Sequence, residues 1–174
     1  MSDVVCSPSS TQAPAEPAGS AGPWPVRCRL VEGEEELAMH HAIRHEVFCV
    51  EQAVFVGDDR DEHDGEGARH VLAFAGAVPG GAVRFYPLDA DGLWQGDRLA
   101  VLRPFRHRHL GAPLVRFAVG SAAALGGHTM LAHVQTPNVR FFEALGWRRH
   151  GPGEIYHGLP HQPMAIEPRC ATTS

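Results

Sequence analysis

The stretch RLAVLRPFRHRHLGAPLVRFAVGSAAALG, residues 98–126, decides the fold because it leads from a strand through a basic loop into a helix. A strand is predicted over Asp97–Leu102, and one apolar stripe predicts a helix over Pro113–Leu125, which a Gly-Gly pair ends. Three arginines and two histidines crowd the loop Arg103–Pro113. Because a helix N-terminus has unpaired N–H groups and partial positive charge, we expect a phosphate-binding loop. A surface turn with solvated arginines is the alternative.

This stretch resembles motif A of the GNAT acetyltransferases, in which a strand is followed by R/Q-x-x-G-x-G/A and a helix. Arg106–Gly111 supplies that segment, with His109 in place of the first glycine. His109 implies either a less extreme backbone dihedral there or an extra donor to phosphate. The resemblance implies that the loop holds the pyrophosphate of acetyl-CoA and that the strand contacts its pantetheine arm. The implied binding residues are Leu99, Ala100, Val101, Arg106, His107, Arg108, His109, Leu110, Gly111 and Ala112.

A second block, HVQTPNVRFFEALGW over residues 133–147, is similar to motif B of the same family. Asn138 matches the family asparagine that touches CoA. Phe142 stands where many relatives carry a tyrosine that protonates the leaving thiolate, so here another group or water must supply that proton. The two blocks in this order imply the GNAT acyl-CoA N-acyltransferase fold, an α/β class fold with a mixed central sheet flanked by helices.

The front of the chain carries a third resemblance, in which IRHEVFCVEQ (residues 43–52) precedes the acidic loop DDRDEHD (58–64). Such a layout occurs in ElaA-like acetyltransferases and, more loosely, in acyl-homoserine-lactone synthases and N-acyl amino acid synthases. The GLPHQPM segment (158–164) also looks like the ElaA group. The whole layout looks closest to a GNAT subgroup associated with nitrogen-starvation gene clusters.

An amine acceptor arrives as a cation, so carboxylates should attract it and a base must take its proton. We expect Arg44, Phe48, Asp59, Asp61 and Asp64 to bind the substrate, and Glu51, Asp97 or His133 to act in catalysis. Apolar neighbours of Glu51 suggest burial that would raise its pKa. The alternatives are an Arg44–Glu51 structural ion pair, a solvated acidic loop, and a His133 that only packs.

No metal is expected from the sequence. His41 and His45 lie one helical turn apart, but no H-E-x-x-H segment follows, and the acidic loop lacks the glycine and glutamate of a calcium loop. The four cysteines form no C-x-x-C pair, which indicates reduced thiols rather than a zinc site. Cys49 is interpreted as a buried thiol rather than an acylated nucleophile.

Composition excludes some classes of function. The 174 residues carry a net charge of −5, and every basic residue other than histidine is arginine, so bulk charge does not favour nucleic acid binding. No apolar run approaches the roughly 18 residues of a membrane span, and residues 1–25 lack the features of a signal peptide. We expect a cytoplasmic monomer or homodimer with a disordered Ser/Pro/Ala-rich tail (1–25), one GNAT domain (26–168) and a short tail (169–174).

The remaining elements follow from patterning. Strands are expected at 26–32 and 129–134, helices at 34–52 and 138–147, and a last hairpin over 148–166. A further hairpin is expected over 69–88, with Pro79-Gly80-Gly81 as its turn.

Three functions follow from these motifs. The leading hypothesis is direct transfer of an acetyl group from acetyl-CoA to a primary amine of a small molecule, with the backbone near Val101 polarising the thioester. The second is a longer-chain N-acyl synthase that uses acyl-CoA or acyl carrier protein. The third is a non-catalytic CoA-binding sensor, which the departures at His109 and Phe142 favour.

Overall fold

A computed structural model describes residues 24–65 and 67–168. The predicted tails therefore lie outside the described residues, apart from Trp24 and Pro25. The elements in chain order are β1 (Val26–Leu30), α1 (Gly33–His45), η1 (Glu46–Glu51), η2 (Glu62–Asp64), β2 (Arg69–Ala75), β3 (Val78–Pro87), β4 (Leu93–Val101), η3 (Arg103–Arg108), α2 (Gly111–Ala124), β5 (Thr129–Gln135), η4 (Thr136–Asn138), α3 (Val139–Ala144), β6 (Arg148–Arg149), β7 (Glu154–Tyr156) and β8 (Leu159–Ile166).

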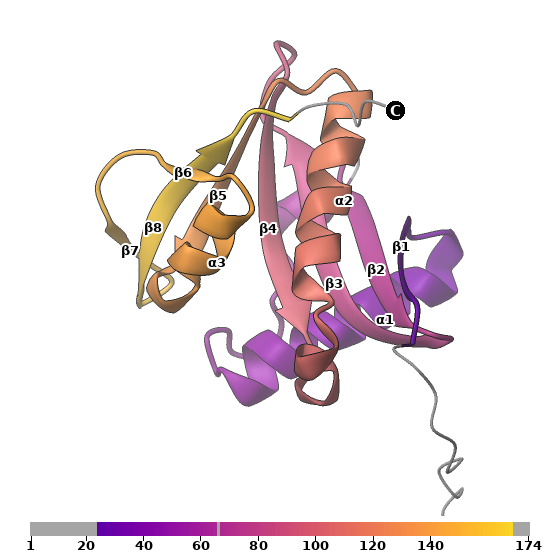
Figure 1. The fold of residues 1–174 in the computed structure, drawn as a ribbon. Helices are drawn as coiled ribbons and strands as arrows, with labels where there is room; N and C mark the ends of the chain where they lie inside the picture. The colour runs from indigo at the N-terminus through magenta and orange to yellow at the C-terminus, as the bar shows by residue number, and fades with distance from the viewer. Residues whose placement is uncertain (1–23, 66, 169–174) are drawn as a thin grey trace, which may run out of the picture.

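The strands form one mixed sheet in the order β1-β2-β3-β4-β5-β8-β6, with β7 paired to β8 (Figure 1). All neighbouring strands are antiparallel except β4 and β5, which run parallel. Helix α2 covers one face of the sheet, and α1 with the π-helical turn η1 covers the other. This arrangement confirms the predicted α/β class with a mixed sheet flanked by helices.

Each face of the sheet has its own apolar core, because successive strand residues point to opposite sides. On β2, Val71 and Ala73 join the core under α2, whereas Leu72 joins the core under α1 with Ile43 and Phe48. Within the described part of the chain, no helix has both the length and the apolar character needed to cross a membrane.

The predicted turn at Pro79-Gly80-Gly81 is wrong, because those residues lie inside β3 and the chain reverses between β2 and β3 at Gly76. The two glycines of β3 serve close packing instead. A Cβ on Gly80 would lie 2.5 Å from the Phe105 ring, and one on Gly81 would lie 2.8 Å from a Leu114 methyl group. The predicted last hairpin is likewise too simple, since β8 pairs with β5, β6 and β7.

The sheet opens between β4 and β5. Their pairing covers Leu93–Gln95 opposite Thr129–Leu131, at the start of both strands. A register shift against β3 then adds one residue to β4 near Arg98, which has a positive φ of 53°. Such a bulge bends a strand and increases its twist. Among the described residues β4 and β5 are not paired beyond this point, so a wedge opens toward their carboxyl ends.

Candidate active site

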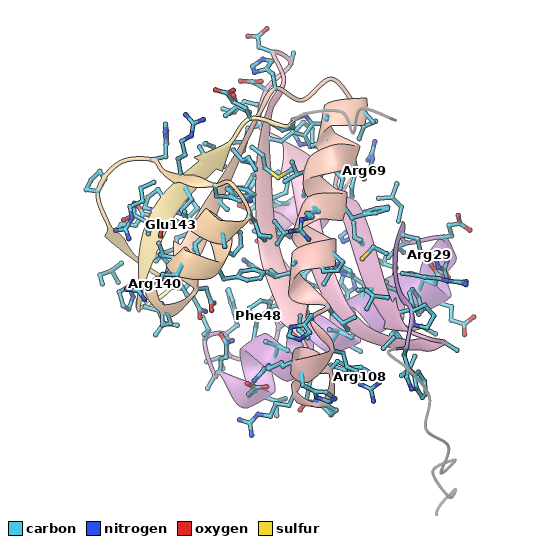
Figure 2. The ribbon with its side chains drawn as sticks, in the orientation of Figure 1. Arg29, Phe48, Arg69, Arg108, Arg140 and Glu143 are labelled. Atoms are coloured by element: carbon cyan, nitrogen blue, oxygen red, sulfur yellow. The ribbon has the colours of Figure 1, made fainter. Side chains whose placement is uncertain are left out.

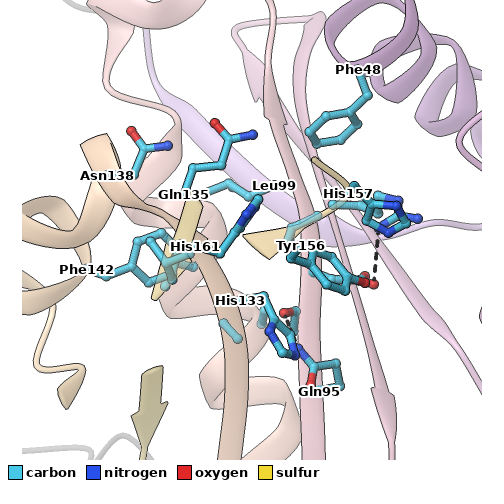
Figure 3. Close-up of a pocket in the computed structure, with 18 of the residues that line it drawn as sticks. Phe48, Gln95, Leu99, His133, Gln135, Asn138, Phe142, Tyr156, His157 and His161 are labelled. Carbon is cyan, nitrogen blue, oxygen red and sulfur yellow. Dashed lines mark hydrogen bonds and ion pairs between the residues drawn. The ribbon is translucent and has the colours of Figure 1, made fainter. Parts of the chain in front are cut away.

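A pocket of about 190 Å³ fills the wedge between β4 and β5 (Figure 3). Its walls come from Gln95–Leu99 of β4 and from Ala132–Gln135 of β5, with further side chains from both faces of the sheet. In open α/β sheets, ligands bind at the carboxyl ends of strands where the connectivity changes direction. The structure brings together six residues that the sequence predicted for the site: Phe48, Asp97, Leu99, His133, Asn138 and Phe142.

His133 is a predicted catalytic residue that lines the pocket and contacts a carboxylate. It projects from β5, and its Nδ1 contacts the Glu154 carboxylate on β7. Its ring stacks on Tyr156, with centroids 4.7 Å apart and planes at 12°. Because a carboxylate at one ring nitrogen fixes the orientation and tautomer of histidine, Nε2 is left to exchange a proton with a ligand.

Two tyrosines line the pocket, and the sequence analysis assigned no role to either. Tyr86 comes from β3 and Tyr156 from β7, and they are the only tyrosines in the chain. Burial, followed by the charge of Asp97, raises the pKa of Tyr86, so that hydroxyl stays protonated. The scarcity of tyrosine was a signal that the sequence carried, because Phe142 leaves the site in need of another proton donor.

Asn138 and Phe142 occupy the wall of the pocket nearest α3. Asn138 directly precedes α3 and is exposed, whereas Phe142 is buried and packs edge-on against Trp147 at a centroid distance of 5.3 Å. Phe142 is therefore a core residue whose edge reaches the pocket, and its ring has no proton to donate.

The basic loop forms the 3-10 turn η3, directly after β4 and before α2. His109, after η3, has φ 57° and ψ 36°, so the expectation of a less extreme dihedral is wrong. The chain keeps the left-handed conformation that glycine favours, at a cost of roughly 1–2 kcal/mol for a residue with a Cβ. Leu110 is buried, and no side chain among the described residues caps the N-terminus of α2. Within that part of the chain, the first N–H groups of α2, at Gly111 and Ala112, are therefore open to an anion.

Arg106 and Arg108 flank this helix end but already have partners. Arg106 Nη2 donates to both Glu51 carboxylate oxygens at 2.6 and 2.8 Å, and its Nε donates to the Val101 carbonyl at 3.1 Å. Arg108 donates from Nε to His107 at 3.1 Å and lies over the Trp24 ring. Figure 2 shows Arg108 at the same end of the sheet as Phe48.

The expectation that burial raises the pKa of Glu51 is wrong. Hydrogen bonding from Arg106 lowers that pKa, and the nearby charge of Arg103 acts in the same direction. Glu51 is therefore held as a carboxylate in an ion pair with the loop, and it does not line the pocket. The alternative of an Arg44–Glu51 ion pair is also wrong, because Arg44 binds Asp59 and Asp64.

Three aspartates of the acidic loop, Asp59, Asp61 and Asp64, are packed inward, whereas Asp58 and Glu62 are exposed. Three guanidinium groups with at most 6% exposure hold four carboxylates around it: Arg44, Arg84 and Arg98 with Asp59, Asp61, Asp64 and Asp97. Arg84 is central, since it donates to Asp97 at 2.6 and 2.8 Å and to Asp61 at 2.6 and 3.0 Å. Burial alone would raise the pKa of Asp61, but the hydrogen bonds and charge of Arg84 lower it. Of these carboxylates, Asp97 lines the pocket.

The comparisons with known proteins agree on one family. A family model for the acetyltransferase (GNAT) domain matches residues 45–168. The chain is 29% identical over 140 residues to "Uncharacterized N-acetyltransferase YjcF" of Bacillus subtilis (strain 168), covering 80% of this chain and 98% of that protein. The crystal structure of Escherichia coli ElaA matches with a TM-score of 0.72 and 21% identity over 82% of this chain and 99% of that one.

The fold also extends to enzymes with other products. The structure of the CoA-dependent acyl-homoserine lactone synthase BjaI matches with a TM-score of 0.65 and 19% identity, over 76% of each chain. At such identities the two solved structures show the fold alone. The family model spans most of the chain, and the chain therefore belongs to the GNAT acetyltransferase family, whose enzymes use acyl-CoA.

Proposed function

We propose that this chain transfers an acetyl group from acetyl-CoA directly to a primary amine of a small molecule. The observation that carries the proposal is the wedge between β4 and β5, which is lined by His133 with Glu154 as its partner and is followed by the N-terminus of α2 after β4. A cavity of about 190 Å³ is smaller than the roughly 300–1,000 Å³ of sites for drug-sized ligands. It suits an acetyl group beside a small acceptor.

The residues around the wedge fit a CoA ester. The N–H groups of Gly111 and Ala112 and the side chains of Arg106 to His109 offer donors and positive charge to a pyrophosphate. Gly111 lets the start of α2 pack against Phe141, since a Cβ there would lie 3.3 Å from the Phe141 ring. In this proposal the backbone of Leu99–Val101 contacts the pantetheine arm, and Asn138 contacts CoA from the other side of the wedge.

His133 is the proposed base. It takes a proton from the acceptor ammonium group, directly or through water, and Glu154 stabilises the imidazolium that forms. The neutral amine nitrogen then bonds to the thioester carbonyl carbon. Backbone N–H groups of β4 near Val101 stabilise the charge that develops on the carbonyl oxygen. The C–S bond breaks, and the nitrogen gives up its second proton, which reaches the leaving thiolate through the Tyr156 hydroxyl or a water molecule.

In this proposal Asp97 and the acidic loop form the binding site for the amine acceptor. Asp97 faces the pocket and places negative charge at its wall, while Arg84 donates a hydrogen bond to each of its two oxygens. Asp59, Asp61 and Asp64 act behind it by fixing Arg84 and Arg98, and Phe48 supplies an apolar wall. The subgroup proposed is ElaA-like, on the resemblance of residues 43–64 and 158–164.

A longer-chain N-acyl synthase is the second candidate, and the inner end of the pocket favours it. That end is apolar, being lined by Val115, Ala118, Met130, Phe142 and Trp147. An acyl chain longer than acetyl would extend toward these residues. The fold shared with BjaI, a CoA-dependent acyl-homoserine lactone synthase, is consistent with such a donor.

Calorimetric titration with acetyl-CoA, butyryl-CoA and a long-chain acyl-CoA tests the donor, and a screen of small amines tests turnover. We expect acetyl-CoA to bind, and Arg106→Ala or Arg108→Ala to weaken binding about 10-fold or more, since a charge-assisted hydrogen bond contributes about 1.5–3 kcal/mol. Arg69→Ala, at the far end of the sheet (Figure 2), is the matched control. Binding of long donors alone would favour the synthase, and binding without turnover of any amine would favour a sensor.

The Cys49→Ala variant tests direct transfer against a cysteine-linked intermediate. Burial, with the charges of Asp59 and Asp58, raises the pKa of the Cys49 thiol, which keeps it protonated and weakly nucleophilic. Cys49 is not among the residues that line the pocket. The variant is expected to retain kcat within about 3-fold, because only the thiolate acts as a nucleophile. Loss of turnover with normal acetyl-CoA binding would instead indicate an acyl-cysteine route.

A further inference from the structure

Three histidine rings meet on the α1 face of the sheet, outside the pocket already described. His40 and His41 come from α1 and His70 from β2, and one ring nitrogen of each lies within 4.8 Å of the other two. The rings meet edge to face, with centroids 4.7 Å apart for His40 and His70. His40 is fully buried, and the other two are partly buried.

Each ring keeps one buried nitrogen that bonds to nothing among the described residues: Nδ1 of His40, Nε2 of His41 and Nδ1 of His70. The other nitrogen of His40, Nε2, lies 3.2 Å from the Val83 carbonyl. Because a carbonyl only accepts, Nε2 carries the hydrogen and Nδ1 carries a lone pair. Histidines that bind metals usually have this arrangement, in which the second ring N–H is held by a carbonyl or carboxylate.

We propose that His40, His41 and His70 form a binding site for a divalent transition metal, with zinc as the ion that fits best, and with the Asp64 carboxylate as the fourth ligand. Asp64 Oδ1 lies 3.7 Å from His41 Nε2. Zinc takes imidazole nitrogens and carboxylate oxygens at about 2.0–2.2 Å in a tetrahedron. Such a tetrahedron needs ligand nitrogens about 3.3 Å apart, so each ring has to shift by less than about 1 Å.

The three rings lie beside the buried network of arginines and aspartates, which Asp64 joins. The adjoining network of three arginines and four aspartates carries one net negative charge. Four protein ligands would close the coordination shell, which is typical of a structural rather than a catalytic zinc site.

The site has a direct connection to the acceptor side. Asp64 bonds to Arg44 and Arg84, and Arg84 holds Asp97 at the pocket wall. An ion bound to three histidines and Asp64 would therefore fix the acidic loop against α1 and β2. Helical spacing alone had paired His41 with His45, but His45 is exposed and lies outside the cluster.

The test uses the full chain without an affinity tag of histidines, stripped with a chelator and titrated with ZnCl₂. We expect one zinc per chain and a rise in Tm on zinc addition, because a ligand that binds only the folded state stabilises it. Co²⁺ in place of Zn²⁺ should give visible absorption bands of tetrahedral nitrogen and oxygen ligation. His41→Ala should weaken zinc binding about 100-fold or more, since changes that only touch a ligand indirectly already cost about 10–100-fold.

His45→Ala is the matched control, because it removes a histidine from the same helix one turn further on. His70→Ala is the second variant, with circular dichroism to show that each protein folds. The proposal stands if His41→Ala and His70→Ala lose the zinc-dependent rise in Tm and His45→Ala keeps it. It is overturned if the stripped wild type binds no zinc stoichiometrically, or if all three variants bind zinc as the wild type does.

Discussion

Replacing His133 by glutamine is expected to lower kcat for acetyl transfer by about 100- to 10,000-fold, which is the usual contribution of a positioned general base. Glutamine keeps the size and polarity of the side chain but cannot accept the ammonium proton. Affinity for acetyl-CoA should stay within about 2-fold, because the proposed pyrophosphate site lies at η3 and α2 rather than on β5. Steady-state kinetics with the acceptor found in the amine screen, together with calorimetry, measure both quantities.

Glu154→Gln separates a positioning role from a structural one. Losing the carboxylate that contacts His133 Nδ1 should lower kcat less than losing His133 itself, and should leave the affinity for acetyl-CoA unchanged. His150→Gln is the control, since His150 is exposed and not among the residues lining the pocket. An unchanged kcat in His133→Gln would remove His133 from the mechanism and return Asp97 to consideration as the base.

The Arg84→Met variant is expected to lose about 3–5 kcal/mol of unfolding free energy, the usual cost of removing one partner from a buried ion pair. The Arg84 side chain is fully buried and hydrogen-bonds to Asp61 and Asp97. Methionine fills much of the same volume, so the loss reports uncompensated carboxylates rather than a cavity. Urea unfolding followed by circular dichroism gives the free energy.

The surface pair of Arg149 and Glu143 provides the comparison for this loss. Their side chains are 60% and 41% exposed, so Arg149→Met should cost no more than about 1 kcal/mol. Arg84→Lys should fall between the two, since lysine keeps the charge but lacks the planar fork that holds two carboxylates. If Arg84→Met were as stable as Arg149→Met, the buried network would contribute nothing to folding.

Much of the fold was predictable because its signals are local. The strand before the basic loop and the helix after it follow from alternation, helical spacing and glycine stops within single stretches of sequence. The turn at Pro79-Gly80-Gly81 was mispredicted because Gly80 is required by close packing against the Phe105 ring, which is distant in sequence, and not by a local chain reversal. Glycine for close approach and glycine for a turn look alike in a sequence.

The site was harder to predict for the same physical reason. Motif spacing pointed to Asn138 and the loop before α2, but the partner of His133 comes from β7, which no spacing rule connects to β5. Glu51 seemed a base because its sequence neighbours are apolar, yet its pKa is set by Arg106, 55 residues away. The charge state of a carboxylate depends on its neighbours in space, and the sequence alone does not identify those neighbours.

The ion pair between Glu51 and Arg106 has a consequence for how tightly this chain can hold a nucleotide. Before any ligand arrives, the guanidinium proposed to receive the pyrophosphate is already occupied by a carboxylate of the same molecule. The Glu51 carboxylate therefore competes with the pyrophosphate for the Arg106 guanidinium. The affinity for the donor then depends on how much more stable the Arg106–pyrophosphate ion pair is than the Arg106–Glu51 ion pair. Each binding event also releases the negative charge of Glu51 from the loop, so donor binding changes the charge beside the pocket.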